Sequence, residues 1–163
     1  MRQILIPVFA LWSSLCGGMS LAEGGSVARI GESGDFLEME YQVNGQRSKD
    51  SLPLYRAEGV RYFSAGVGID ERSAEYPPFP LKLVFTAGGK PFLAGVAVTI
   101  QSAKGGPPIN IPHDHVNGPW LFVELPSGAY HLTAVHAGQA QGLKGVTVET
   151  GKMKTVHLRW PEE

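Results

Sequence analysis

The amino-acid sequence predicts an all-β protein, an antiparallel β-sandwich of about seven strands with an N-terminal extension. Short runs in which apolar and polar residues alternate are typical of half-buried strands. Glycine and proline, 21 and 12 of the 163 residues, gather between these runs, where turns are expected. No stretch keeps a 3.6-residue apolar period over the length of a helix, which excludes a helical fold.

Residues 1–22 have the three parts of a secretory signal peptide. Arg2 supplies a positive charge, an apolar run follows from Ile4 to Leu15, and small residues at Ser20 and Ala22 precede a cut after Ala22. The run is shorter than the roughly 20 residues that cross a bilayer. We therefore expect a periplasmic or secreted protein without stable membrane insertion.

Residues 23–58 differ from the rest, because their apolar residues are scattered among glycines and polar side chains. Phe36, Met39, Tyr41 and Val43 lead into Asn44-Gly45, a favoured two-residue hairpin turn. This segment is predicted to be an N-terminal extension or an edge hairpin.

Residues 59–163 are predicted to form the sandwich itself. Glu124 is the first polar residue in the run 120–125, which is otherwise apolar on both faces and is therefore predicted to be a central strand. The runs that we expect to be strands are 60–64, 81–85, 96–100, 120–125, 130–134, 146–148 and 156–160. Turns rich in glycine and proline separate them.

The C-terminal half of the sequence resembles a known family of domains. Leu125 to Ala134 resembles the Leu-Pro-x-Gly-x-Tyr-x-Leu-x-Ala turn and strand of carboxypeptidase regulatory-like domains, also called transthyretin-like or prealbumin-type. Gly95 to Ile100 is similar to their Gly-Val-x-Val-x-Ile strand, and the likeness covers about residues 80–160. An immunoglobulin-like sandwich is the alternative, because glycine-turn-tyrosine patterns recur there.

The resemblance implies an accessory β-sandwich that is generally non-catalytic, found beside metallocarboxypeptidases or free in the periplasm or at the cell surface. The zinc motif of the peptidase, His-x-x-Glu with a distant His, is missing from the sequence. Peptidase activity is therefore not expected of this chain.

His113-Asp114-His115 is the densest group of metal-capable side chains. In an extended segment His113 and His115 point to the same side, and imidazole binds zinc and copper. His131 or His157 could complete such a site. Solvated surface histidines are the alternative interpretation, since two imidazoles alone do not close a metal site.

Two other groups of residues raise functional questions. Asp70-Glu71-Arg72 joins two carboxylates and a guanidinium, which is typical of a turn cap with a local salt bridge, and Asp70 is expected to support stability. Trp120 and Trp160 are large enough to stack on sugars or peptides, although we expect both to pack in the core.

These observations favour a non-catalytic envelope module for binding or protein interaction, and not an enzyme. Its 14 basic and 15 acidic residues leave a net charge of −1, which gives no electrostatic footprint for nucleic acid. The expected partner is an envelope protein, a peptide, a glycan or a second copy paired through an edge strand. The alternative function is periplasmic metal binding by His113 and His115, with zinc or copper as the cofactor.

Overall fold

The computed structural model describes residues 25–88 and 92–161, so the predicted signal peptide lies outside the described residues. Within these residues the protein forms twelve strands in three sheets, one short helix and one 3-10 turn. This confirms the predicted all-β sandwich, with more strands than the expected seven or so. No helix in the described part of the chain has both the length and the apolar character to cross a membrane.

The central sheet has five strands in the order β12-β6-β9-β5-β4. They are β4 (Tyr55–Ala57), β5 (Val60–Ala65), β6 (Leu81–Ala87), β9 (Trp120–Val123) and β12 (Lys154–Trp160). The run that is apolar on both faces, β9, lies in the middle as expected. One pair departs from the antiparallel pattern, because β12 runs parallel to β6.

The second sheet has four strands in the order β11-β10-β7-β8. They are β7 (Ala97–Ser102), β8 (Ile109–Ile111), β10 (Gly128–His136) and β11 (Gln139–Val148). The sequence did not predict β8, which is only three residues long, or the first half of β11, which is polar and glycine-rich. Neither segment has enough alternating apolar residues to reveal a strand.

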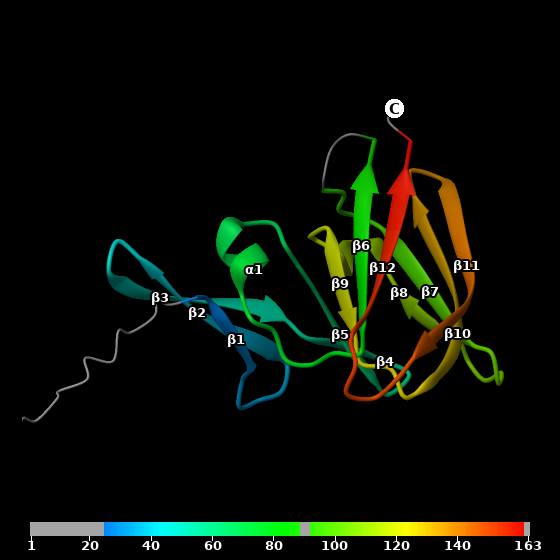
Figure 1. Ribbon diagram of the computed structural model, residues 1–163, viewed down its shortest axis with the longest axis horizontal. Helices are drawn as coiled ribbons and strands as arrows, with labels where there is room; N and C mark the ends of the chain where they lie inside the picture. The colour runs from blue at the N-terminus through cyan, green and yellow to red at the C-terminus, as the bar shows by residue number, and fades with distance from the viewer. Residues whose placement is uncertain (1–24, 89–91, 162–163) are drawn as a thin grey trace, which may run out of the picture.

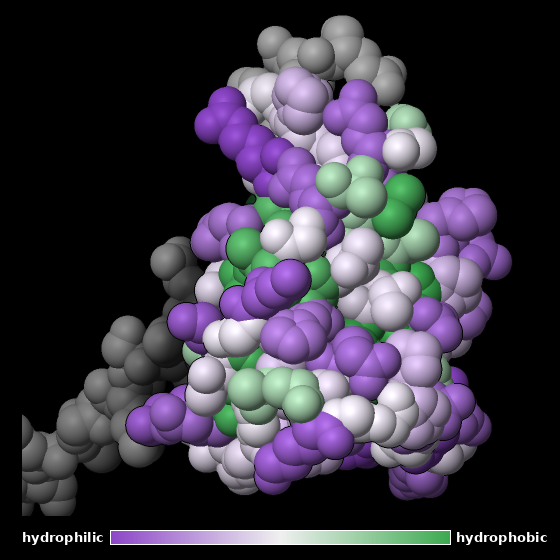
Figure 2. Space-filling model, turned by 90° about the vertical axis from the view of Figure 1, so that its right-hand side faces the viewer, coloured by the Kyte–Doolittle hydropathy of each residue, from purple (hydrophilic) through white to green (hydrophobic). Residues whose placement is uncertain are grey.

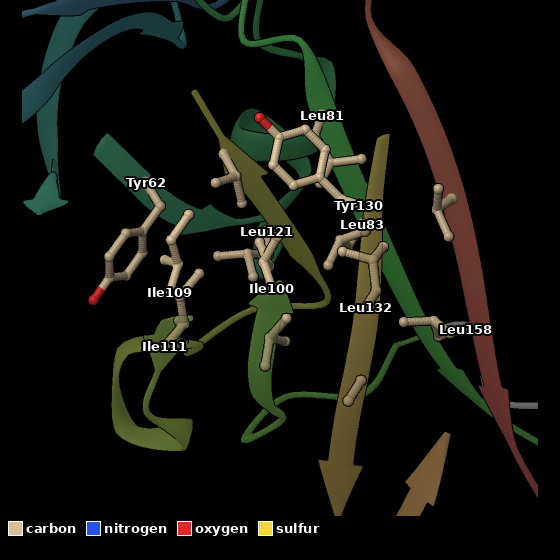
Figure 3. Packing of buried hydrophobic residues seen from close by; sticks show 14 of the residues in the cluster. Tyr62, Leu81, Leu83, Ile100, Ile109, Ile111, Leu121, Tyr130, Leu132 and Leu158 are labelled. Carbon is tan, nitrogen blue, oxygen red and sulfur yellow. The ribbon is translucent and has the colours of Figure 1, made fainter. Parts of the chain in front are cut away.

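The main core fills the space between these two sheets. Figure 3 shows Leu81, Leu83 and Leu158 of the central sheet facing Ile100 and Leu132 of the second sheet. These five side chains are at most 3% exposed. Trp160 belongs to the same core, as predicted, and its indole N–H donates to the Gln139 carbonyl at 3.0 Å.

A third sheet covers part of the other face of the central sheet. Its strands are β1 (Val27–Ile30), β2 (Phe36–Val43) and β3 (Gln46–Pro53), and they lie to one side of the sandwich in Figure 1. The hairpin predicted at Asn44-Gly45 joins β2 to β3, with φ angles of 52° and 77° that suit such a turn.

The third sheet is held by a second core. Leu37 and Met39 of β2 pack with Phe63 of β5 and Phe122 of β9, while Phe79 fills the space beside them. Residues 25–53 are therefore a packed layer, and the central sheet is buried on both faces where this layer lies.

Candidate functional site

The paired histidines lie in a tight turn between β8 and β9. His113–His115 forms a 3-10 helix, η1, in place of the extended segment that the sequence predicted. Residues two apart in a 3-10 helix point in different directions, so the two imidazoles do not share a side. His113 is exposed, whereas His115 is half-buried.

His115 is held by two tyrosines of the central sheet. The Oη of Tyr62 lies 2.8 Å from Nδ1 of His115, and the ring of Tyr55 stacks on the imidazole with centroids 3.8 Å apart. Burial raises the pKa of Tyr62, helped by the nearby Tyr55 and Asp114, so its hydroxyl stays protonated at neutral pH. One ring nitrogen of His115 is thus engaged within the protein.

The other histidines lie elsewhere. His131 is on the exposed face of β10, where its Nδ1 accepts from the Gly145 N–H at 3.3 Å, and His157 is exposed on β12. His136 lies beside Trp160 and the Gly95 carbonyl. Among the residues that the structure describes, no three His, Cys, Asp or Glu side chains are grouped to hold a metal ion.

The Asp70-Glu71-Arg72 segment forms a single helical turn, α1 (Ile69–Ser73), after β5. Oε2 of Glu71 accepts from the backbone N–H groups of Gly66 and Val67, at 2.7 and 3.1 Å. Glu71 therefore closes the turn between β5 and α1. The predicted cap is present, but Glu71 and not Asp70 makes these bonds.

Arg72 does not form the salt bridge that the sequence predicted. The ion pairs in the described residues join Lys49 to Glu40, Arg61 to Glu124 and Lys152 to Glu149. The guanidinium of Arg72 lies 4.5 Å from the ring centroid of Phe92 and within 3.5 Å of the Val67 carbonyl. It joins α1 to the segment that leads into β7.

Trp120 is not an open stacking platform. It is half-buried, and the Lys82 ammonium lies 3.4 Å from the centroid of its ring. Gly66 approaches it so closely that a Cβ there would come within 3.0 Å of the indole. Trp120 therefore packs against the second core, which agrees with the predicted structural role.

A set of exposed apolar residues, here named the corner patch, lies on and beside the turn that carries Arg72. It consists of Val67, Ile69 and Phe92, with 61%, 75% and 44% of their surface exposed. Arg72 contacts the Val67 main-chain carbonyl and the Phe92 ring, and Ile69 begins the helical turn that contains Arg72. The sequence pattern did not predict this patch, although Val67 and Ile69 are apolar residues in a glycine-rich turn, where no strand buries them.

The side of the sandwich that carries β11 has a different character. Figure 2 shows mainly hydrophilic and intermediate side chains there, with apolar atoms in scattered spots over the area that grey atoms leave visible. The register of β11 against β10 shifts between Tyr130 and Leu132, beside Gly145. Such a bulge protects an edge strand from pairing.

Searches of protein-family models, curated proteins and solved structures found no match to the chain.

Proposed function

We propose that the protein is a non-catalytic binding module of the cell envelope, periplasmic or secreted, that recognises another protein through the corner patch. The observation that carries this proposal is the exposure of Val67 and Ile69, two large apolar side chains on one turn. Large apolar side chains that remain exposed together mark interaction sites more often than single ones do. The signal-like residues 1–22 and the resemblance over residues 80–160 support the location and the non-catalytic class.

The turn that carries these side chains is held in place before any partner arrives. Glu71 binds both N–H groups at its start, and the hydroxyl of Tyr76 donates to the Glu71 carbonyl at 2.7 Å. A side chain on a fixed backbone loses less entropy on binding. Full burial of Val67 or Ile69 would contribute about 1.5–3 kcal/mol each.

Two of the edge strands, β3 and β11, are less suited to recognition. Strand β3 presents Arg47, Lys49 and Asp50 along an exposed edge, and charges on an edge oppose pairing with a second strand. The bulge in β11 has the same effect. We therefore favour binding in which the corner patch enters an apolar pocket of the partner over binding by strand pairing at an edge.

The test compares two variants in a crosslinking pull-down from envelope extract. Ile69→Ser removes the most exposed side chain of the corner patch, and Met153→Ser removes an apolar side chain that is 57% exposed in a different loop. We expect Ile69→Ser to lose a partner that the wild type and Met153→Ser both retain. Equal capture by all three proteins would contradict the role of the corner patch.

A further inference from the structure

Lys82 occupies an unusual position on the outer face of the central sheet. Its side chain is half-buried, and its ammonium lies 3.4 Å from the ring centroid of Trp120 and 5.2 Å from that of Phe122. Aromatic faces attract a cation but supply less stabilisation than the water that they displace. The ammonium has therefore lost part of its hydration to two aromatic rings.

No carboxylate offsets this loss within the described residues. The ion pairs found there do not include Lys82, and no hydrogen bond of its Nζ is found there either. Burial alone lowers the pKa of Lys82, without an opposing effect from a neighbouring acid. Glu71, on the nearby turn, is already engaged by backbone N–H groups.

The sheet register places further nitrogen-bearing side chains on the same face. Val84 lies between Trp120 of β9 and His157 of β12, in one row across the sheet. Thr155 is the neighbour of Lys82 and Arg159 that of Thr86. The side chains of β6 and β12 that point toward this face are Lys82, Val84, Thr86, Thr155, His157 and Arg159. None of these six is acidic.

The β12 side of this face is exposed to solvent. Strands are about 4.8 Å apart, so the Cα atoms of Trp120 and His157 lie about 10 Å apart on either side of Val84. In Figure 1, β6 and β12 stand in the foreground, and none of the described elements crosses in front of them. His157 is exposed and Val84 is half-buried, so one partly accessible apolar side chain lies between Trp120 and His157 in this row.

We propose that this face binds one anionic group, a carboxylate or a phosphate, over Val84, with Lys82 as its ion-pair partner and His157 as a second donor. The anion supplies the charge that the ammonium lacks, and a charge-assisted hydrogen bond is among the stronger polar contacts. Thr155 stands beside Lys82 with a hydroxyl that can bind a further oxygen. The site does not depend on the corner patch, because none of its groups is Val67, Ile69 or Phe92.

The experiment follows the indole N–H signals of the full chain by NMR during titration with inorganic phosphate or with triglutamate, at constant ionic strength. We expect a saturable shift of the Trp120 signal, while the signal of the core residue Trp160 stays in place. Saturation by phosphate alone identifies a phosphate ligand, by triglutamate alone a carboxylate ligand, and by both the shared chemistry. A sodium chloride titration that reproduces the shift, or shifts that grow without saturation, would overturn the site.

Variants distinguish anion binding at this site from a general electrostatic attraction to the protein. Lys82→Gln is expected to weaken binding about 10- to 100-fold, whereas Lys82→Arg keeps a cation and retains most of it. His157→Gln tests the second donor at an exposed position where folding is not at stake. The control is Lys104→Gln, which removes an exposed lysine in a different loop and should bind like the wild type. Undiminished binding by folded Lys82→Gln would refute the proposal.

Discussion

The imidazole of His115 lies flat against the ring of Tyr55, with centroids 3.8 Å apart and planes 5° apart. Tyr55 belongs to β4, the edge strand of the central sheet, and His115 follows β8, the edge strand of the second sheet. The contact therefore joins the two layers at an edge where no backbone ladder connects them. We therefore infer that His115 stabilises the packing of the two sheets at this edge.

Replacement of His115 by alanine should lower the free energy of unfolding by about 1–3 kcal/mol. The variant loses the stack on Tyr55 and leaves the hydroxyl of Tyr62 without its partner. His113→Ala is the matched control, since that exposed side chain should contribute within about 0.5 kcal/mol. Urea unfolding followed by circular dichroism measures both. Equal stability of the two variants would show that the stack contributes nothing.

Calorimetric titration with zinc and with copper tests the metal hypothesis directly. We expect no stoichiometric binding at His113 and His115, because they point in different directions and Nδ1 of His115 lies 2.8 Å from the Tyr62 hydroxyl. A closed site needs about four ligands. Stoichiometric heat that disappears in His113→Ala would establish the metal site after all.

Glu71→Ala should cost about 1–3 kcal/mol of stability, because the carboxylate that binds the N–H groups of Gly66 and Val67 is removed. Asp70→Ala on the same turn should cost about 0.5 kcal/mol or less, since no side-chain hydrogen bond of Asp70 is found in the described residues. Thermal unfolding distinguishes the two. A larger effect at Asp70 would restore the role that the sequence predicted for it.

Alternation in the sequence predicted the strands whose two faces meet different environments. Residues 81–85 and 156–160 have one face in the core and one toward solvent, and both became strands of the central sheet. The third layer was not predicted, because the alternation of Leu37 and Met39 with glutamates indicated a hairpin but not the surface against which its apolar face packs. A signal for it was present. Phe63 follows Tyr62 and Phe122 follows Leu121, so both strands are apolar on two faces.

The candidate sites were harder to predict, because they depend on residues that are distant in sequence. The pair of Tyr55 and His115 and the contact of Lys82 with Trp120 arise only from the register of strands in space. Local patterns carry no information about such contacts. The His-Asp-His triplet is a site that the sequence suggested and the structure does not form. The prediction needed an extended backbone, but residues 113–115 form a 3-10 turn that directs the two imidazoles apart.

Glu124→Gln should weaken the protein by about 0.5–1 kcal/mol at neutral pH and flatten its loss of stability in acid. The bidentate hydrogen bonds from Arg61, at 2.6 and 2.7 Å, hold the pKa of Glu124 below its ordinary value of 4.5. A lowered pKa in the folded state gives stability that is present above 4.5 and is lost as the pH falls through the lower value. Urea midpoints between pH 7 and pH 3, in a cycle with Arg61→Gln, isolate the pair. Parallel pH profiles for wild type and Glu124→Gln would contradict the assignment.

Leu37→Ala tests whether the third sheet unfolds together with the sandwich. Leu37 is fully buried in the second core, so its truncation should cost about 2–5 kcal/mol. Val43→Ala is the matched control, because Val43 has the same parity on β2 but is 47% exposed near the hairpin turn, and it should change stability little. Urea unfolding followed both by far-ultraviolet circular dichroism and by the NMR signal of the Trp160 indole N–H reports the whole chain and the main core separately. A shift of both midpoints together shows one cooperative unit. If Leu37→Ala moved the first midpoint and left Trp160 unchanged, residues 25–53 would be a layer that the sandwich does not need.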